Sequence, residues 1–354
     1  MRRAVLFAVL FAVAGLAVYA PAAPAAAAPR PLAPLQPDAL PASPFGAPVR
    51  DRVIRSAPAA RAALLRRLVP GHYFRTKGGT RILVVVSPSY RYNPSSIQSF
   101  VDFLDGLDHG GELGRLRLVI ETPAEIGRDC STEALACYTT PGDILRVPGE
   151  DQTGEAPLPY IIAHEYGHHV AWHRSNAPFP AITFGPKRWA SQERVCPGVA
   201  ARHQRLFPGD EGRHYFDNPG EGWAESYAQN YYAENKLPNL PWRYSPLLTP
   251  DEASFRAVRA DVKHPWRHRT GRSFTITGRN ARRTVSTPLD GVANIRVRAP
   301  RGTRVSARLV AHGSRLPHGR VGGARGSLVC GPRSVQLRVT RTGRGPLRVT
   351  VLRP

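Results

Sequence analysis

The sequence has few of the residues that would place it in several common classes of protein. It contains only four cysteines, and no two of them form a Cys-x-x-Cys pair, so a zinc site built from thiolates is not expected. After residue 20, no apolar run approaches the ~20 residues that a membrane-spanning helix needs. Lysine is scarce too, because 45 of the 49 basic residues are arginines.

Acidic residues are nearly absent from the last part of the chain. Residues 271–354 contain 18 arginines, no lysine and one acid, Asp290, which leaves a net charge of +17 out of +23 for the whole chain. A surface of this kind attracts polyanions through its summed field. It has one aromatic residue, Phe274, whereas surfaces for single-stranded nucleic acid usually offer several stacking rings. An anionic surface polymer is therefore the expected partner, and specific binding of nucleic acid is not expected.

The first 28 residues have the pattern of a signal peptide. Arg2 and Arg3 precede an uncharged apolar run over residues 4–20, and residues 21–28 are the small residues and prolines that signal peptidase accepts. An uncleaved membrane anchor is the alternative, but the run is short for a membrane span. We predict that residues 1–28 are removed, that the chain is secreted into the extracellular space, and that it keeps no stable membrane insertion.

The four cysteines are an even number in an exported chain, which indicates two disulfides. Four cysteines allow three pairings. Cys130 and Cys137 are close enough in sequence to close a small loop, and Cys196 and Cys330 are then left to pair by elimination. The second bridge ties two distant parts of the chain together.

The chain divides by composition into an N-terminal leader and two folded parts. Residues 29–70 are rich in proline and alanine and are interpreted as a leader or propeptide, with apolar spacing that predicts one or two short helices over residues 50–69. Residues 71–268 are predicted to form an α+β catalytic domain. Its expected elements are strands at 81–86 and 115–120, a hairpin at 135–147, and helices at 94–107, 158–172, 218–232 and 251–262.

Residues 269–354 are predicted to form a small β-sandwich-like module rich in arginine. Apolar and polar residues alternate in five short runs separated by glycine-containing turns, at 273–277, 293–298, 305–310, 335–340 and 347–351. The arginines take the polar positions, so each strand has one apolar and one cationic face.

The segment from His164 to His168 carries the strongest chemical signal. On a helix these two histidines lie one turn apart on one face, where both can aim at one metal ion, and Glu165 lies beside them. This is the His-Glu-x-x-His arrangement of zinc peptidases. His169 and His173 form a second such pair on a different face, which we interpret as structural or solvent-facing.

A catalytic zinc needs a third protein ligand. Ala171 and Arg174 stand where one branch of zinc peptidases continues with glycine and histidine, so that branch is excluded. Glu221 and Glu225 lie one helical turn apart on a later helix, so the first can bind zinc while the second holds a ligand histidine by its free N–H.

Two alternatives for the third ligand remain open. Glu221 could instead complete a capping box with Asn218, which would leave Glu225 as the ligand. An aspartate, Asp210 or Asp217, is the other alternative.

The two motifs together, His164-Glu165-x-x-His168 and Glu221-x-x-Ala224-Glu225, resemble those of the gluzincin peptidases, the thermolysin-like branch in a broad sense. The resemblance covers about residues 80–235, and its 52-residue spacer between the motifs is longer than in thermolysin itself. It implies a zincin-like fold with bound Zn²⁺, Glu221 as third ligand and Glu225 behind a ligand histidine. The hairpin at 137–147 is similar to the edge strand with which such enzymes hold substrate.

The expected reaction is hydrolysis of a peptide bond in a protein or peptide substrate. Glu165 acts as general base on a zinc-activated water, and the tetrahedral oxyanion needs a further donor, for which Tyr215 is the first candidate and His214 the second. The predicted function is that of a secreted zinc-dependent endopeptidase. The alternative is a secreted binding protein for anionic polymers with a structural or inactive zinc site. Glu165 favours the first, because a structural zinc site has no use for a general base.

Overall fold

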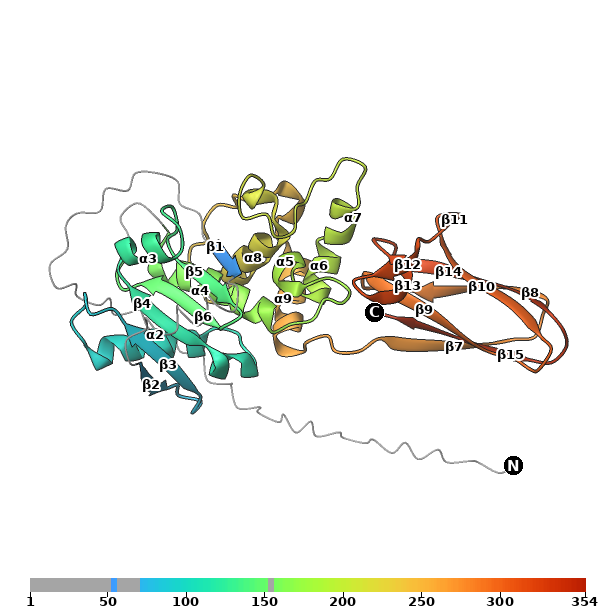
Figure 1. Cartoon of the computed structure of the whole chain (residues 1–354), viewed down its shortest axis with the longest axis horizontal. Helices are drawn as coiled ribbons and strands as arrows, with labels where there is room; N and C mark the ends of the chain where they lie inside the picture. The colour runs from blue at the N-terminus through green and yellow to red at the C-terminus, as the bar shows by residue number, and fades with distance from the viewer. Residues whose placement is uncertain (1–51, 56–70, 152–155) are drawn as a thin grey trace, which may run out of the picture.

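The structure is a computed structural model that describes residues 52–55, 71–151 and 156–354 (Figure 1). The predicted signal peptide and most of the predicted leader lie outside the described residues. Up to residue 263 the described chain mixes helices with one sheet, and from residue 270 it is built of strands, which confirms the α+β class. None of the helices in the described ranges is long and apolar enough to cross a membrane.

The first sheet has six strands in the order β1-β5-β6-β4-β3-β2. The parallel neighbours β3, β4 and β6 form its centre, β5 runs antiparallel to β6, and β2 runs antiparallel to β3. The central strands are mostly apolar and mostly buried, as expected of parallel strands covered on both faces. The bounds are β1 (Arg52–Arg55), β2 (His72–Arg75), β3 (Arg81–Val86), β4 (Arg117–Glu121), β5 (Cys137–Thr140) and β6 (Ile144–Pro148).

The first strand overturns one prediction. The spacing over residues 50–69 predicts helix, but β1 is a strand that pairs in parallel with β5, and residues 56–70 lie outside the described residues. Val53 and Ile54 are β-branched and favour a pleated neighbour, so pairing with the sheet outweighs the helical spacing. As a result β1 covers the outer side of β5, which is therefore not the free edge strand that the gluzincin resemblance implies.

The long helices lie close to their predicted positions. They are α2 (Pro94–Gly106), α4 (Leu158–Trp172), α8 (Pro219–Glu234) and α9 (Glu252–Lys263). The sequence analysis missed α3 (Pro123–Asp129), α5 (Ala181–Phe184), α6 (Lys187–Gln192) and α7 (Val195–Val199), together with the 3-10 turns η1 (Gly111–Arg115), η2 (Tyr215–Asp217) and η3 (Pro246–Leu248). These elements have too few residues to show a helical period.

One hydrophobic core joins the first sheet to the long helices. Phe100 of α2, Leu118 of β4, Tyr166 of α4 and Trp223 of α8 all belong to it and are fully or almost fully buried. Helix α4 packs against β5 and β6 as well as against α8, so nearly all of its side chains are buried. A helix buried on all sides holds its polar side chains in fixed positions.

The residues from Thr270 onward form two antiparallel sheets, with strand orders β11-β10-β14-β8 and β12-β13-β9-β15-β7. The buried side chains of these two sheets share a second core. Leu337 of the four-stranded sheet and Val349 of the five-stranded sheet both contribute to it. Side chains of β14 alternate between buried and exposed, as the sequence pattern indicates. The strands are β7 (Thr270–Ile276), β8 (Asn280–Ser286), β9 (Gly291–Arg298), β10 (Arg304–Ala311), β11 (Ser314–Arg315), β12 (His318–Val321), β13 (Ala324–Val329), β14 (Ser334–Thr342) and β15 (Leu347–Arg353).

Both predicted disulfides are present, Cys130–Cys137 and Cys196–Cys330, which fits an oxidising compartment. The second bridge joins α7 to the strands after residue 270. Beside it, the only acid of the last 84 residues, Asp290, is buried. The Lys187 ammonium donates to its backbone oxygen at 2.9 Å, and its backbone N–H donates to Ser191 Oγ at 2.9 Å. Asp290 is therefore a structural residue at the join.

Replacing Cys196 and Cys330 together by alanine should lower the free energy of unfolding more than replacing Cys130 and Cys137. The two bridges span 134 and 7 residues, and loop-closure entropy then corresponds to ~5 and ~2.5 kcal/mol. Urea unfolding of the two double variants measures both losses. An equal or smaller loss for the long bridge would contradict this expectation.

Candidate metal centre

Helix α4 places His164, Glu165 and His168 in the interior. Their exposed fractions are 2%, 0% and 0%. The helix begins at Leu158, whose backbone N–H donates to Asp151 Oδ1 at 2.8 Å, and the apolar residues around the motif keep it in the core. Both imidazoles are therefore buried in the interior.

Helix α8 brings the two glutamates against this face. Gly167 permits the close approach, because a Cβ added there would lie 2.9 Å from Ala224 Cα. The indole N–H of Trp223 donates to the Gly167 carbonyl at 2.8 Å, which fixes the two helices relative to each other. The histidine motif and the glutamate motif thus meet where α4 packs against α8.

The three predicted ligands lie together. Glu221 Oε2 is 3.3 Å from His164 Nε2 and 3.3 Å from His168 Nε2. Ligands that surround zinc tetrahedrally at about 2.0–2.2 Å are spaced about 3.3–3.6 Å apart. The three atoms form one of two candidate metal-binding groups in the part of the chain that the structure describes.

Glu225 stands behind the histidine and away from the centre. Its Oε2 lies 3.2 Å from His164 Nδ1, and its Oε1 accepts hydrogen bonds from Tyr160 Oη at 2.7 Å and Gln229 Nε2 at 3.2 Å. A carboxylate can only accept, so Nδ1 carries a proton, and a metal bound at Nε2 would leave that proton in place. This is how metal-ligating histidines are commonly oriented.

The capping alternative for Glu221 does not hold. The Asn218 side chain caps α8 by accepting from the Gly220 N–H at 3.0 Å, and the Asn218 backbone N–H donates to the Tyr215 carbonyl. The carboxylate of Glu221 therefore has no capping role and turns to the histidines. Asp210 and Asp217 belong to neither candidate metal group of the described residues.

The electrostatics of the group suit a cation. Burial alone would raise the pKa of Glu221, but the two histidines beside it hold that pKa far below its ordinary value. Burial lowers the pKa of His168, which favours its neutral form. An ionised carboxylate and neutral imidazoles are the states in which these groups bind a metal.

Two buried atoms of the group fit a cation as well. Glu221 Oε1 and His168 Nε2 have no hydrogen-bond partner among the described residues. A buried, ionised carboxylate with one unpaired oxygen is costly unless a positive charge offsets it. The donor set of two imidazoles and a carboxylate is one that zinc accepts.

No protein-family model, no curated protein and no solved structure matches the chain. What the site can do therefore follows from its own donor atoms, their spacing and their burial.

The two candidate oxyanion donors have other contacts. Tyr215 is buried, and its hydroxyl donates to Glu221 Oε2 at 3.0 Å, so it holds the carboxylate that faces the histidines. The ring of His214 stacks on Phe207 with centroids 3.7 Å apart.

Sequence reasoning missed one aromatic residue beside the site. The ring of Tyr244 stacks on His164, with centroids 6.2 Å apart and planes inclined by 22°, and it also lies 6.0 Å from the ring of Tyr215. Tyr244 is half-buried. It follows α8 in a loop with no helical or strand period, so no local pattern marked it.

Proposed function

We propose that this protein is a secreted zinc-dependent endopeptidase with a gluzincin-like, zincin-type catalytic domain. The observation that carries the proposal is that Glu221 Oε2 lies 3.3 Å from both His164 Nε2 and His168 Nε2, with Glu165 on the same helix as the histidines. Zinc held there would polarise a peptide carbonyl and make water acidic enough to attack near neutral pH. The two disulfides support a site of action outside the cell.

The chain's own residues divide the remaining work. Glu165 takes the proton from the attacking water and delivers it to the amine nitrogen as the C–N bond breaks. Glu225 and Tyr160 keep the His164 ring in its ligating orientation, and Tyr215 does the same for the Glu221 carboxylate. Because all of these side chains are buried, the proton transfer takes place away from bulk water.

Tyr244 is proposed as the donor to the developing oxyanion, in place of Tyr215. Replacing Tyr244 by phenylalanine should lower kcat about 10²–10³-fold and leave zinc affinity unchanged, because one oxyanion donor is lost. Tyr215→Phe should instead weaken zinc binding about 10–100-fold, because Glu221 loses the hydroxyl that orients it. Steady-state kinetics and chelator competition on both variants measure this. If Tyr215→Phe alone lowers kcat with zinc affinity intact, Tyr215 is the donor that the sequence predicted.

The position of β1 bears on how substrate enters. An extended peptide can add to the edge of a sheet, but β1 already pairs with the outer side of β5. A chain that begins at Gly71 should therefore cleave peptides faster than one that begins at Pro29. A synthetic peptide of residues 50–57 added in trans should slow the shorter chain. Equal rates for both chains, with no effect of the peptide, would show that β1 does not limit access to the site.

The strands after residue 270 are proposed to bind an anionic polymer. A cavity of about 470 Å³ between β9, β10 and β13 has Ile295 and Leu309 in its lining. Four of its other lining residues are arginines, Arg296, Arg308, Arg315 and Arg325, and none is a carboxylate. Apolar contact with cationic groups around it suits an anionic polymer, whose binding should weaken with salt.

The test of function is cleavage of a broad peptide library by the purified protein, read by mass spectrometry. Internal cleavage that a chelator stops and zinc restores supports the proposal. A protein that binds polyanions and zinc but cleaves no peptide would favour the alternative, a binding protein with an inactive zinc site.

A further inference from the structure

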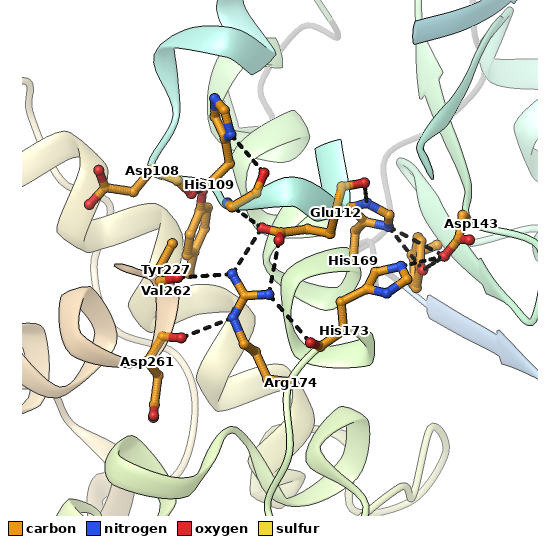
Figure 2. A network of polar contacts seen from close by, with 12 residues as sticks. Asp108, His109, Glu112, Asp143, His169, His173, Arg174, Tyr227, Asp261 and Val262 are labelled. Carbon is orange, nitrogen blue, oxygen red and sulfur yellow. Dashed lines mark hydrogen bonds and ion pairs between the residues drawn. The ribbon is translucent and has the colours of Figure 1, made fainter. Parts of the chain in front are cut away.

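The second histidine pair of α4 meets an aspartate from the sheet. Sequence reasoning treats His169 and His173 as structural or solvent-facing, but the turn between β5 and β6 places Asp143 against both. Asp143 Oδ1 lies 2.8 Å from His173 Nε2 and 3.7 Å from His169 Nδ1 (Figure 2). These residues form the second candidate metal-binding group of the described chain.

The hydrogen bonds around this group show which nitrogen of His169 can bind a metal ion. His169 Nε2 lies 3.0 Å from the Glu112 carbonyl, which can only accept, so Nε2 carries the ring proton and Nδ1 offers a lone pair. The Tyr138 hydroxyl lies 3.1 Å from that Nδ1 and 3.0 Å from Asp143 Oδ1, yet it has a single proton for two acceptors. Asp143 Oδ1 also accepts from His173 Nε2 at 2.8 Å, and a cation that replaced this proton could bind both imidazoles and the carboxylate together.

A rigid shell holds His169 in this orientation. Arg174 donates to both carboxylate oxygens of Glu112, at 2.9 and 3.0 Å, and to the backbone carbonyls of Asp261 and Val262 (Figure 2). The Glu112 carbonyl is thereby fixed where it accepts from His169. A histidine whose far nitrogen donates to a fixed carbonyl is pre-oriented for metal binding.

The donor set and the surroundings define the class of ion. Two imidazoles and one carboxylate suit zinc and related first-row transition metals, whereas calcium and magnesium prefer oxygen ligands. The side chains of Asp143 and His173 are 22% and 14% exposed, and His173 also lines a cavity of about 830 Å³, so an ion and its water ligands can enter.

We propose that Asp143, His169 and His173 bind a second divalent transition-metal ion, which fastens the β5–β6 turn to the end of the helix that carries His164 and His168. This ion has a structural role and takes no part in hydrolysis. The proposal does not depend on the peptidase activity, since it rests on a different set of donor atoms.

The experiment is equilibrium dialysis of the full chain against Zn²⁺ alone, with one variant for each site. The wild type should bind two equivalents, and Asp143→Asn and His173→Asn should each bind one. Asparagine suits residue 143, whose φ is +57°, so the turn keeps its backbone while losing the carboxylate. His312→Asn is the matched control, because His312 is an exposed histidine with φ +47° in the turn between β10 and β11, and it should still bind two equivalents.

A His164→Ala variant separates this proposal from the proposed function. It should keep one equivalent, which is lost when His173→Asn is added, and zinc should raise its Tm but not that of the double variant. A wild type whose only equivalent is lost in His164→Ala would overturn the second site. So would a second equivalent that survives His173→Asn. A single equivalent that survives His164→Ala and needs His173 would support the second site and refute the first.

Discussion

Replacing Glu165 by glutamine is expected to leave zinc bound and to remove peptide hydrolysis. Glutamine has the size and shape of glutamate, so the fully buried position stays filled, but its amide cannot take a proton from water. Loss of a general base typically lowers the rate by ~10²–10⁴-fold. The measurement is kcat for a fluorogenic peptide, on protein whose zinc content has been determined in the same sample.

Glu193 offers a matched control for this variant. Burial raises its pKa to about 7, so Glu193→Gln also removes a half-buried carboxyl, but one at the end of α6 and outside the candidate metal groups. It should keep wild-type kcat. Zinc-loaded Glu165→Gln protein that still hydrolyses peptides at the wild-type rate would contradict the role assigned to Glu165.

Glu221→Ala and Glu225→Ala are expected to differ sharply in zinc affinity. Glu221 Oε2 faces both imidazoles, so its loss leaves two protein ligands and should abolish stable zinc binding at neutral pH. Among the candidate ligands Glu225 contacts His164 alone, at its far nitrogen, so its loss should weaken binding about 10–100-fold and leave some activity that added zinc restores. The measurement is chelator competition in an Asp143→Asn background. That substitution removes the proposed second site, so the competition reports on the site of Glu221 alone.

The reverse order of affinities would change the assignment. If Glu225→Ala loses the metal while Glu221→Ala keeps it, the ligand is one helical turn further along α8. Because Asn218 caps that helix without help from Glu221, Glu221→Ala should not show the ~1 kcal/mol loss of a helix cap.

The sequence was most informative where residues that can bind a metal recur at the spacing of a helical turn. His164 and His168 share a helix face at a spacing that a metal requires, and Asn218 followed by proline marks the start of the helix that carries Glu221. The disulfide pairing followed from the count and placement of four cysteines. Each of these inferences depends either on residues close together in sequence or on elimination among only four cysteines.

Contacts between distant segments could not be foreseen in the same way. Val53 and Ile54 form a strand because β5 offers them a partner more than 80 residues later. Asp143 reaches His169 and His173 only because the β5–β6 turn lies across the end of α4. Tyr244 reaches His164 from a loop without a period, so its place beside the metal centre is visible only in three dimensions.

The most direct test of the central claim follows zinc content and peptide hydrolysis together while a chelator strips the metal from the wild-type protein and from His168→Ala. We predict that wild-type hydrolysis falls in step with loss of one zinc equivalent and returns when zinc is added. His168→Ala should lack that equivalent and hydrolyse nothing at any stage. Hydrolysis that persists in metal-free protein, or a fully zinc-loaded wild type that cleaves no peptide of a broad library, would contradict the account.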